Sequence, residues 1–155
     1  MDIKELKFVR LTDPSNTDLI PRYLIDQTRD KDFETDRFYA IAPLLVVNRF
    51  NIFGLFVDNN KNVKGFLWAT INILSEQLYV SVISIDKEYQ NCNGDTLEHI
   101  FNMIRDLPNN ILIKQMIKHA EINLKKTVQI VTKRPKVYEK RQWRCATATI
   151  MEKEI

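Results

Sequence analysis

The sequence predicts an α/β domain whose mixed central sheet is mainly antiparallel and flanked by helices. Three observations favour this class: strand-like runs rich in Val, Ile and aromatic residues, helical patterns between them, and an Asn-rich turn joining two of the strands. The predicted order of elements is β-α-α-β-β-β-α-α-β-α-β, which combines hairpins with helical crossovers. A length of 155 residues favours a single domain, which we assign to residues 1–155.

The first third of the chain predicts one strand and two helical segments. Leu6 to Thr12 alternates apolar and polar residues, and the turn-forming run Asp13-Pro14-Ser15-Asn16 ends it. A helix is expected over Asp18 to Asp30. The residues at helical spacing within it are Leu19, Tyr23, Leu24 and Gln27. Phe38 to Phe50 is apolar but contains Pro43, so it predicts a short helix or an irregular segment.

The middle of the chain predicts an antiparallel meander. Two β-rich runs, Ile52 to Asp58 and Val63 to Ile73, are joined by Asn59-Asn60-Lys61-Asn62. Because Asn tolerates the left-handed turn conformation, this pattern is typical of a β-hairpin. A third run, Gln77 to Ile85, follows after Ser75-Glu76 and should pair with the second.

The last third predicts helices and strands in alternation. Asp95 or Thr96 can cap a helix that runs to about Arg105, and a second helix is expected from Ile111 to Lys125. The remaining predicted elements are a strand over Thr127 to Thr132, a short helix from Pro135 to Arg141, and a final strand from Arg144 to Met151.

Charge is distributed unevenly along the chain. Residues 1–110 hold 12 Lys/Arg against 16 Asp/Glu, whereas residues 111–155 hold 11 against 4. The basic last third could attract a phosphorylated cofactor, nucleic acid or an acidic partner, or form an ordinary solvated face. Nucleic acid is the less expected partner, because no predicted strand interleaves basic and aromatic residues as RNA-binding sheets do.

The cysteines and the hydropathy pattern exclude several classes. Cys92 and Cys145 lack CxxC spacing, and His99 and His119 lack partners at metal-ligand spacing, so we expect no disulfide framework and no metal site. No apolar run approaches the roughly 18–20 residues that a membrane-spanning helix needs. We therefore expect a cytoplasmic protein with no membrane association, or one built into a particle assembled inside the cell.

Three local motifs, in this order of elements, resemble the GNAT superfamily of acetyl-CoA-dependent N-acetyltransferases. The hairpin LFVDNNKNVKGFLWATI (residues 55–71) is similar to the family's second and third strands. LYVSVISIDKEYQN (residues 78–91) is similar to its fourth strand and the V-D-P-x-Y-R/Q exit from that strand. RPKVYEKRQW (residues 134–143) resembles the A-x-x-x-Y-E-K-x-G-F ending. The resemblance covers roughly Leu6 to Glu152.

The resemblance implies acetyl-CoA as the acyl donor and a binding site along the fourth strand. In the family the fourth and fifth strands splay apart, here near Ile83 and Ile130, and the pantetheine arm pairs with exposed main chain of the fourth. The matching residues are Val82, Ile83, Ser84 and Ile85. Pyrophosphate is expected on the turn into the next helix, where amide donors and the helix dipole favour anions. The matching residues are Gln90, Asn93, Gly94, Asp95 and Thr96, and Asn109-Asn110 is a rival position for this turn.

The resemblance also implies catalytic residues. The tyrosine of the YEK segment commonly protonates the departing thiolate in the family, and its match is Tyr138. A phenol with a reference pKa of about 10 is a suitable proton donor to a thiolate. Glu76, Asp86 and Glu88 flank the predicted cleft strand and could deprotonate an amine through water, or be solvated charges at the strand ends. Of these three we assign Glu76 as the catalytic candidate.

Two functions from different classes follow. The first is acetyl transfer from acetyl-CoA to an amine that the sequence does not identify. The alternative is a GNAT-fold protein without catalysis, acting as a structural or binding component with protein partners, for example in a phage virion. The alternative is favoured by the loop, because Asn93 and Asp95 stand where the family pattern Q/R-x-x-G-x-G/A has glycines, and the side chain of Asp95 would repel pyrophosphate.

Overall fold

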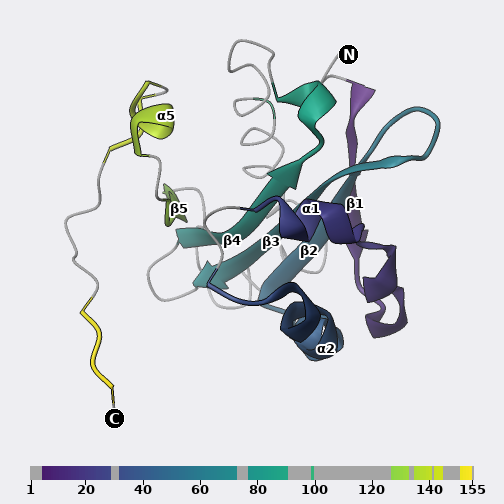
Figure 1. The fold of residues 1–155 in the computed structure, drawn as a ribbon, viewed down its shortest axis with the longest axis horizontal. Helices are drawn as coiled ribbons and strands as arrows, with labels where there is room; N and C mark the ends of the chain where they lie inside the picture. Colours follow the sequence, from purple (N-terminus) through teal and green to yellow (C-terminus); the bar gives the residue numbers. More distant parts are fainter. Residues whose placement is uncertain are drawn as a thin grey trace, which may run out of the picture.

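The structure is a computed structural model of the chain. It describes residues 5–28, 32–72, 77–90, 99, 127–132, 135–140, 142–144 and 151–154. These residues contain a five-stranded sheet with strands in the order β1-β2-β3-β4-β5 (Figure 1). The strands are β1 (Lys7–Leu11), β2 (Asn51–Val57), β3 (Val63–Asn72), β4 (Gln77–Ile85) and β5 (Thr127–Ile130).

The pairing confirms a mixed, mainly antiparallel sheet. Each strand from β1 to β4 pairs antiparallel with the next, and β5 pairs parallel with β4. The parallel step is expected, because β5 returns to the sheet only after the long connection in which two helices were predicted. That connection, including the predicted helices from Asp95 to Arg105 and Ile111 to Lys125, lies outside the described residues except for His99, which is helical.

Five helical elements have their bounds within the described residues. A 3-10 helix η2 spans Pro14–Leu19, α1 spans Arg22–Asp26 and α2 spans Thr35–Val46. A second 3-10 helix, η3, spans Lys87–Tyr89 directly after β4, and α5 spans Pro135–Glu139. Among the described residues, no helix is long and apolar enough to cross a membrane.

The prediction of one helix over Asp18 to Asp30 is wrong. The carboxylate of Asp13 caps η2 by accepting from the main-chain N–H of Ser15 at 2.9 Å, so helical structure begins earlier than expected. Ile20 then adopts an extended conformation, since the residue before a proline is disfavoured in the helical region. Pro21 is the N-cap of α1, so the predicted helix is divided into two short elements.

The apolar segment before the hairpin is a helix rather than an irregular stretch. α2 begins at Thr35, three residues before the predicted start, and contains Pro43. The helix continues to Val46 because Phe38, Ala42 and Val46 share one buried face that packs against the sheet. Tertiary packing therefore outweighs the hydrogen bond that Pro43 cannot donate.

The hairpin between β2 and β3 is confirmed, with one change in its turn. Asp58 organises the turn, since its Oδ1 accepts from the main-chain N–H groups of Asn60 at 2.9 Å and Asn62 at 2.8 Å. The left-handed residue is Lys61, with φ 63°, and not one of the three asparagines that predicted the turn.

The sheet carries an apolar cluster on each face. On one face α1 and α2 cover the sheet (Figure 1), and Leu24, Phe38 and Phe66 are among the side chains buried there. On the other face Leu67, Val80 and Tyr89 belong to a second buried cluster. Trp68 is half-buried against the first cluster and stacks on Phe53 at 5.5 Å between ring centroids.

The end of the chain tests the last predictions only in part. The helix predicted from Pro135 is present as α5, two residues shorter than expected. The final strand was predicted from Arg144 to Met151. Arg144 and Met151 are described, and neither lies in a strand; Met151 is exposed. Residues 145–150 lie outside the described part.

Candidate functional site

The two halves of β4 have different neighbours. In the first half, Gln77 to Val80, each residue pairs with β3 on one edge and with β5 on the other. In the second half, Ser81 to Ile85, pairing with β3 continues, but no described residue pairs with the opposite edge, because β5 ends at Ile130 opposite Val80. β4 therefore presents main-chain groups that no neighbouring strand of the described sheet satisfies.

A β-bulge separates the two halves. Trp68 of β3 pairs with Val82 and Ala69 pairs with Val80, so Ser81 is an extra residue in β4. The extra residue shifts the alternation of side chains. Val80 consequently belongs to the cluster on one face of the sheet and Val82 to the cluster on the other. The bulge lies where the pairing with β5 stops.

The register of β4 identifies which residues face the open edge. Asp86 donates its main-chain N–H to the carbonyl of Lys64, just before β3, at 2.6 Å. Alternate residues of an antiparallel strand direct their main-chain groups to opposite edges, so Ser84 and Val82 also face β3. The N–H and C=O groups of Ile83 and Ile85 face the other way. Of the four residues predicted to contact the donor, these two direct their main-chain groups away from β3.

Helix α1 is tied to the end of β4 by side-chain hydrogen bonds. Gln27 donates from Nε2 to Ser84 Oγ at 2.9 Å and to the Ile85 carbonyl at 2.7 Å. Ser84 is buried, and its Oγ donates to the carbonyl of Leu24 at 2.6 Å. Gln90, at the C-cap of η3, donates from Nε2 to the same Ile85 carbonyl at 2.8 Å. The carbonyl of Ile85 is thus occupied, whereas no hydrogen bond to its N–H or to Ile83 is found in the described residues outside the strand ladder.

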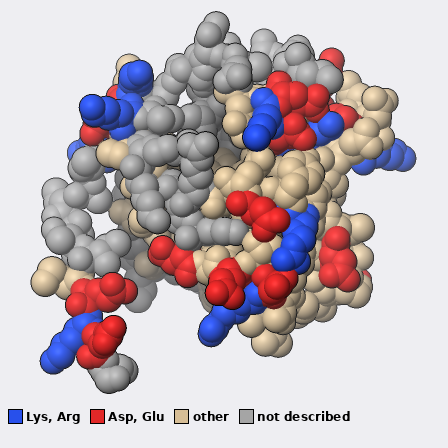
Figure 2. Space-filling model, in the orientation of Figure 1, with Lys and Arg blue, Asp and Glu red and all other residues tan. Residues whose placement is uncertain are grey.

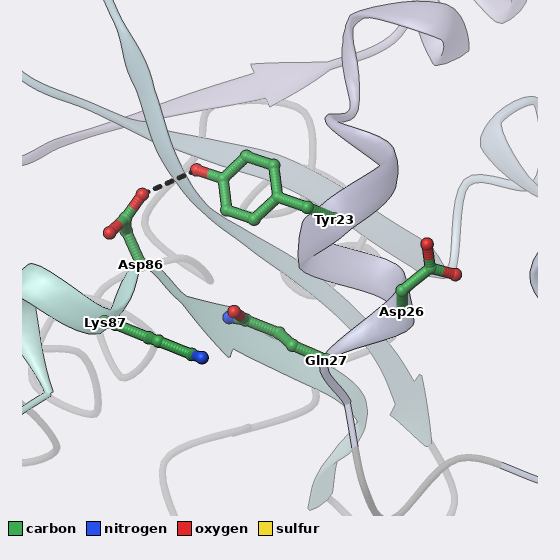
Figure 3. Close-up of a pocket in the computed structure, with 5 residues that line it drawn as sticks. All are labelled: Tyr23, Asp26, Gln27, Asp86 and Lys87. Atoms are coloured by element: carbon green, nitrogen blue, oxygen red, sulfur yellow. Dashed lines mark hydrogen bonds between the residues drawn. The ribbon is translucent and has the colours of Figure 1, made fainter.

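A pocket opens beside this strand end. It has a volume of about 490 Å³ and is lined by Tyr23, Asp26 and Gln27 of α1 and its C-cap, and by Asp86 and Lys87 after β4. Figure 3 shows Tyr23 pointing toward Asp86 and Gln27 extending toward β4, with the side chain of Lys87 directed toward Gln27 and Asp26 on the far side. Gln27 therefore belongs both to the pocket and to the open edge.

The contact between Tyr23 and Asp86 shifts the pKa of both groups. The Tyr23 hydroxyl donates to Asp86 Oδ2 at 2.7 Å. Burial, together with this hydrogen bond and the nearby carboxylate, raises the pKa of Tyr23 well above its usual value. Burial alone would raise the pKa of Asp86, but the bonds from Tyr23 and the Glu88 N–H and the charge of Lys64 outweigh it and lower that pKa. At neutral pH Tyr23 is protonated and Asp86 is ionised.

The other charged groups of the pocket favour a cation over an anion. Asp26 accepts from Thr35 Oγ1 at 2.5 Å and lies 4.0 Å from Arg22, which also contacts Asp36 at 2.5 Å. The lining itself contains two carboxylate side chains, Asp26 and Asp86, and one amine side chain, Lys87. Figure 2 shows Asp/Glu and Lys/Arg side chains intermixed on the face that bears α1 and α2, so this face is no extended basic surface.

The predicted pyrophosphate turn and base fall mostly beyond the described residues. Gln90 is described and contacts Ile85, whereas Asn93, Gly94, Asp95, Thr96, the rival turn at Asn109-Asn110 and Glu76 lie outside the described part. Of the other two carboxylates that were considered, Asp86 lines the pocket, and Glu88 pairs with Lys64 at 2.6 Å. Within the described residues there is no cluster suited to a metal ion.

Tyr138 is buried on α5. Its ring makes an edge contact with Trp143 at 5.4 Å between centroids, and its carbonyl accepts from the Trp143 N–H at 3.2 Å. Tyr138 is not among the described residues that line the pocket. Its predicted role as a proton donor stays a prediction.

Sequence reasoning missed most of the pocket. Tyr23, Asp26, Gln27 and Lys87 were not predicted as site residues. The sequence did contain a signal for Tyr23 and Gln27, because both lie at helical spacing with Leu24. Polar side chains on the inner face of a helix need polar partners, which indicates a polar site nearby. The partners, Asp86 and the Ile85 carbonyl, lie about sixty positions away in the sequence, and a single-sequence pattern does not reveal such distant pairings.

The sheet order, the bulge in β4, the loss of pairing to β5 and the helices on one face define an α/β protein of the N-acetyltransferase fold class. The chain has the GNAT fold, as its sequence motifs predicted, and comparison with solved structures supports this. It is similar to a possible acetyltransferase from Clostridium difficile 630, with 14% identity, a TM-score of 0.66 and 97% of each chain covered.

Two further solved structures agree. The aminoglycoside 6'-N-acetyltransferase AAC(6')-Ih from Acinetobacter baumannii is 13% identical with a TM-score of 0.62, covering 97% of this chain and 99% of that one. The spermidine/spermine N-acetyltransferase SpeG from Vibrio cholerae is 15% identical with a TM-score of 0.59, covering 90% of this chain and 76% of that one. No protein-family model matches the sequence, and no curated protein matches it either.

Proposed function

We propose that the protein is an N-acetyltransferase that transfers the acetyl group of acetyl-CoA to an amine. The observation that carries the proposal is the second half of β4, where the main chain of Ile83 and Ile85 has no neighbouring strand among the described residues. Main-chain N–H and C=O groups at an open edge can pair with an extended amide-containing ligand as a further strand would. The pantetheine arm of acetyl-CoA is such a ligand.

The bulge at Ser81 marks the proposed start of the donor site. Toward the N-terminus of β4, strand β5 occupies the neighbouring position, and toward its C-terminus no described strand pairs with this edge over Ser81 to Ile85. A donor lying along this edge would have its phosphates near the residues after η3. This is where Gln90 lies and where Asn93, Gly94, Asp95 and Thr96 follow in the sequence.

The pocket between α1 and Asp86 is the proposed acceptor site. An amine arrives as an ammonium ion at neutral pH, and the ionised carboxylates of Asp26 and Asp86 would attract it. Asp86 is suited to binding rather than to proton removal, because its lowered pKa makes it a weak base. Proton removal therefore needs another group, and Glu76 remains the candidate.

Attack by the neutral amine nitrogen on the thioester carbonyl would form the amide and release coenzyme A as a thiolate, which needs a proton. Tyr23 is a poor donor, since the raised pKa of its phenol holds the proton tightly. Tyr138 remains the proposed general acid. Tyr138→Phe should lower kcat for acetyl transfer at least about 100-fold, which is the low end of what general-acid catalysis contributes. Its affinity for acetyl-CoA should stay within a factor of two.

Calorimetric titration with acetyl-CoA tests the proposal. The expected result is saturable binding and a rise in melting temperature, because a ligand that binds only the native state stabilises it. If millimolar acetyl-CoA gives neither heat nor a shift in melting temperature, the enzyme proposal fails. That result would favour the alternative of a GNAT-fold binding or structural component, including the proposed virion role. Pull-down with candidate partner proteins would then follow.

A further inference from the structure

On the edge of β4 that faces away from β3, the strand end is held by a side chain from α1, and no described strand pairs with it there. Gln27 Nε2 lies 2.7 Å from the Ile85 carbonyl and 2.9 Å from Ser84 Oγ, so one amide group contacts two consecutive residues of the open half. Ser84 Oγ in turn donates to Leu24 O at 2.6 Å, one turn before Gln27. The three groups form a closed link between α1 and the strand end.

We infer that Gln27 is a positioning residue for the acyl donor; this rests on the proposed function. An unpaired strand end loses its extended geometry readily, because only one neighbouring strand restrains it. The amide of Gln27 fixes the peptide of Ile85 and so fixes the direction in which the Ile83 and Ile85 main-chain groups point. A donor that binds along this edge then meets groups already in place, which lowers the ordering that binding requires.

The link also determines which main-chain groups the donor can use. The Ile85 carbonyl faces the open edge, but it already accepts from Gln27 and Gln90. Both lone pairs of a carbonyl oxygen are then engaged. The acceptor left for a donor amide is the Ile83 carbonyl, beside the donor groups of Ile83 N–H and Ile85 N–H. Gln27 therefore selects one register for the pantetheine arm.

Gln27→Met tests this inference. Methionine has a similar length and no hydrogen-bond donor, so the link is lost with little change in volume. Calorimetry with acetyl-CoA should show an affinity about 5-fold to 10-fold weaker, since one or two hydrogen bonds of ordinary strength are lost. The matched control is Tyr39→Phe, which removes a 2.5 Å hydrogen bond from α2 to the Ile20 carbonyl in the same helical layer. The control should bind within a factor of two of the unaltered protein.

A second variant separates positioning from packing. Gln27→Glu keeps the shape of the side chain but turns a carboxylate toward the Ile85 carbonyl. At pH 8 its acetyl-CoA affinity should fall at least as far as that of Gln27→Met. Toward pH 5 the carboxyl can take up a proton and donate to Ile85, so the ratio of variant to wild-type dissociation constants should fall. A packing defect would leave this ratio independent of pH.

The outcomes distinguish the two proposals. If the unaltered protein binds acetyl-CoA and both Gln27 variants bind equally well, Gln27 has no positioning role and the proposed function stands. The same conclusion follows if Tyr39→Phe weakens binding as much as Gln27→Met, or if the Gln27→Glu ratio does not change with pH. If the unaltered protein does not bind acetyl-CoA, both proposals fall. Should Gln27→Met not fold, Ser84→Ala removes the hydroxyl side of the link and keeps the Gln27–Ile85 bond. Its affinity for acetyl-CoA should then fall about 2-fold to 3-fold, and an unchanged affinity would count against the positioning role.

Discussion

The first and second halves of β4 share one strand but have opposite surroundings. From Gln77 to Val80 the strand has a neighbour on both edges, and Leu78 and Val80 are buried in the core. From Ser81 to Ile85 the described residues supply a neighbouring strand on one edge only, and on the other edge the Ile85 carbonyl accepts from the side chains of Gln27 and Gln90. The first half behaves as scaffold, whereas the second offers polar main chain at a pocket.

The difference shows how a short irregularity can create a binding edge. A strand with both edges paired has no main-chain groups left for a ligand. The bulge at Ser81 increases the local twist of β4, and beyond it the pairing with β5 is lost. Side chains of α1 then hold the freed strand. If the two halves differ in this way, substitutions in the first half should change only the folding stability. Substitutions in the second half should change both the folding stability and the affinity for acetyl-CoA.

The largest effect is expected for Val80→Asp in the scaffold half. Val80 is 1% exposed, and a carboxylate there would have no partner in an apolar cluster. Burying an unpaired charge destabilises a protein by more than about 4 kcal/mol, which is close to the whole stability of a domain. Circular dichroism should show loss of the cooperative thermal transition.

Tyr79→Asp is the matched control, because Tyr79 lies next in the strand and is 37% exposed. It should lose no more than about 1 kcal/mol in urea unfolding. Equal destabilisation by the two substitutions would contradict the assignment of the scaffold half to the core.

A smaller effect on stability is expected for substitutions of Gly54 and Gly65, and only one of these glycines contacts the second half of β4. A Cβ at Gly65 would lie 2.9 Å from the Phe56 ring and 3.0 Å from the Ser84 carbonyl, so Gly65→Ala presses on the second half of β4. A Cβ at Gly54 would lie 1.9 Å from the Phe8 ring on β1, a strand that β2 and β3 separate from β4. Each Ala variant should lose about 1–3 kcal/mol in urea unfolding, as overpacking does.

Acetyl-CoA affinity should separate these variants. Gly65→Ala should weaken binding several-fold because the Ser84 main chain must move, whereas Gly54→Ala should leave it unchanged because only the Phe8 ring must move. The comparison uses calorimetry at a temperature where both variants are folded. An affinity loss for Gly54→Ala alone would contradict the location of the donor site.

A still smaller effect is expected for Tyr23→Phe, which removes the hydrogen bond to Asp86. Because Tyr23 is 45% exposed, the loss should be no more than about 1 kcal/mol at pH 7. The folded-state pKa of Asp86 is lowered, so its stabilising contribution is present above the unfolded pKa of about 4 and is lost as pH falls through the folded value.

The consequence is a difference in acid response. In Tyr23→Phe the pKa of Asp86 should rise, so less stability remains to be lost on acidification below about pH 4. In urea unfolding, the free energies of unfolding of the unaltered protein and Tyr23→Phe should differ more at pH 7 than at pH 3. A difference that grows at pH 3 would show that the Asp86 carboxylate is not stabilised by this phenol.

The sequence predicted the strands more accurately than the helices and the pocket. The β2–β3 hairpin and β4 were predicted within one residue, because alternation and turn chemistry are local signals. α1 was not, because the extended conformation of Ile20 before Pro21 breaks the helical pattern. The open edge was expected at Val82 to Ile85 only through the family resemblance. That Ile83 and Ile85 face the edge depends on register, which a bulge at Ser81 changes and no local pattern reveals.

The smallest effect, of opposite sign, is expected in the turn between β2 and β3. Lys61 holds a left-handed conformation with φ 63°. This conformation is least costly for Asn, more costly for an unbranched side chain such as Lys, and most costly for a β-branched side chain. Asn populates this region readily, so Lys61→Asn should stabilise the protein by about 0.5 kcal/mol. The Asp58 carboxylate, which accepts from Asn60 and Asn62, would keep the turn in place.

Lys61→Asn also sharpens the contrast within β4, because it raises stability without touching either half of that strand. The midpoint of urea unfolding should increase slightly while the acetyl-CoA dissociation constant stays the same. If Lys61→Asn instead bound acetyl-CoA more tightly, the affinity would depend on the overall folding stability of the sheet. The effects of Gly65→Ala could then no longer be assigned to the Ser84 main chain, and the separation between scaffold and binding edge would be lost.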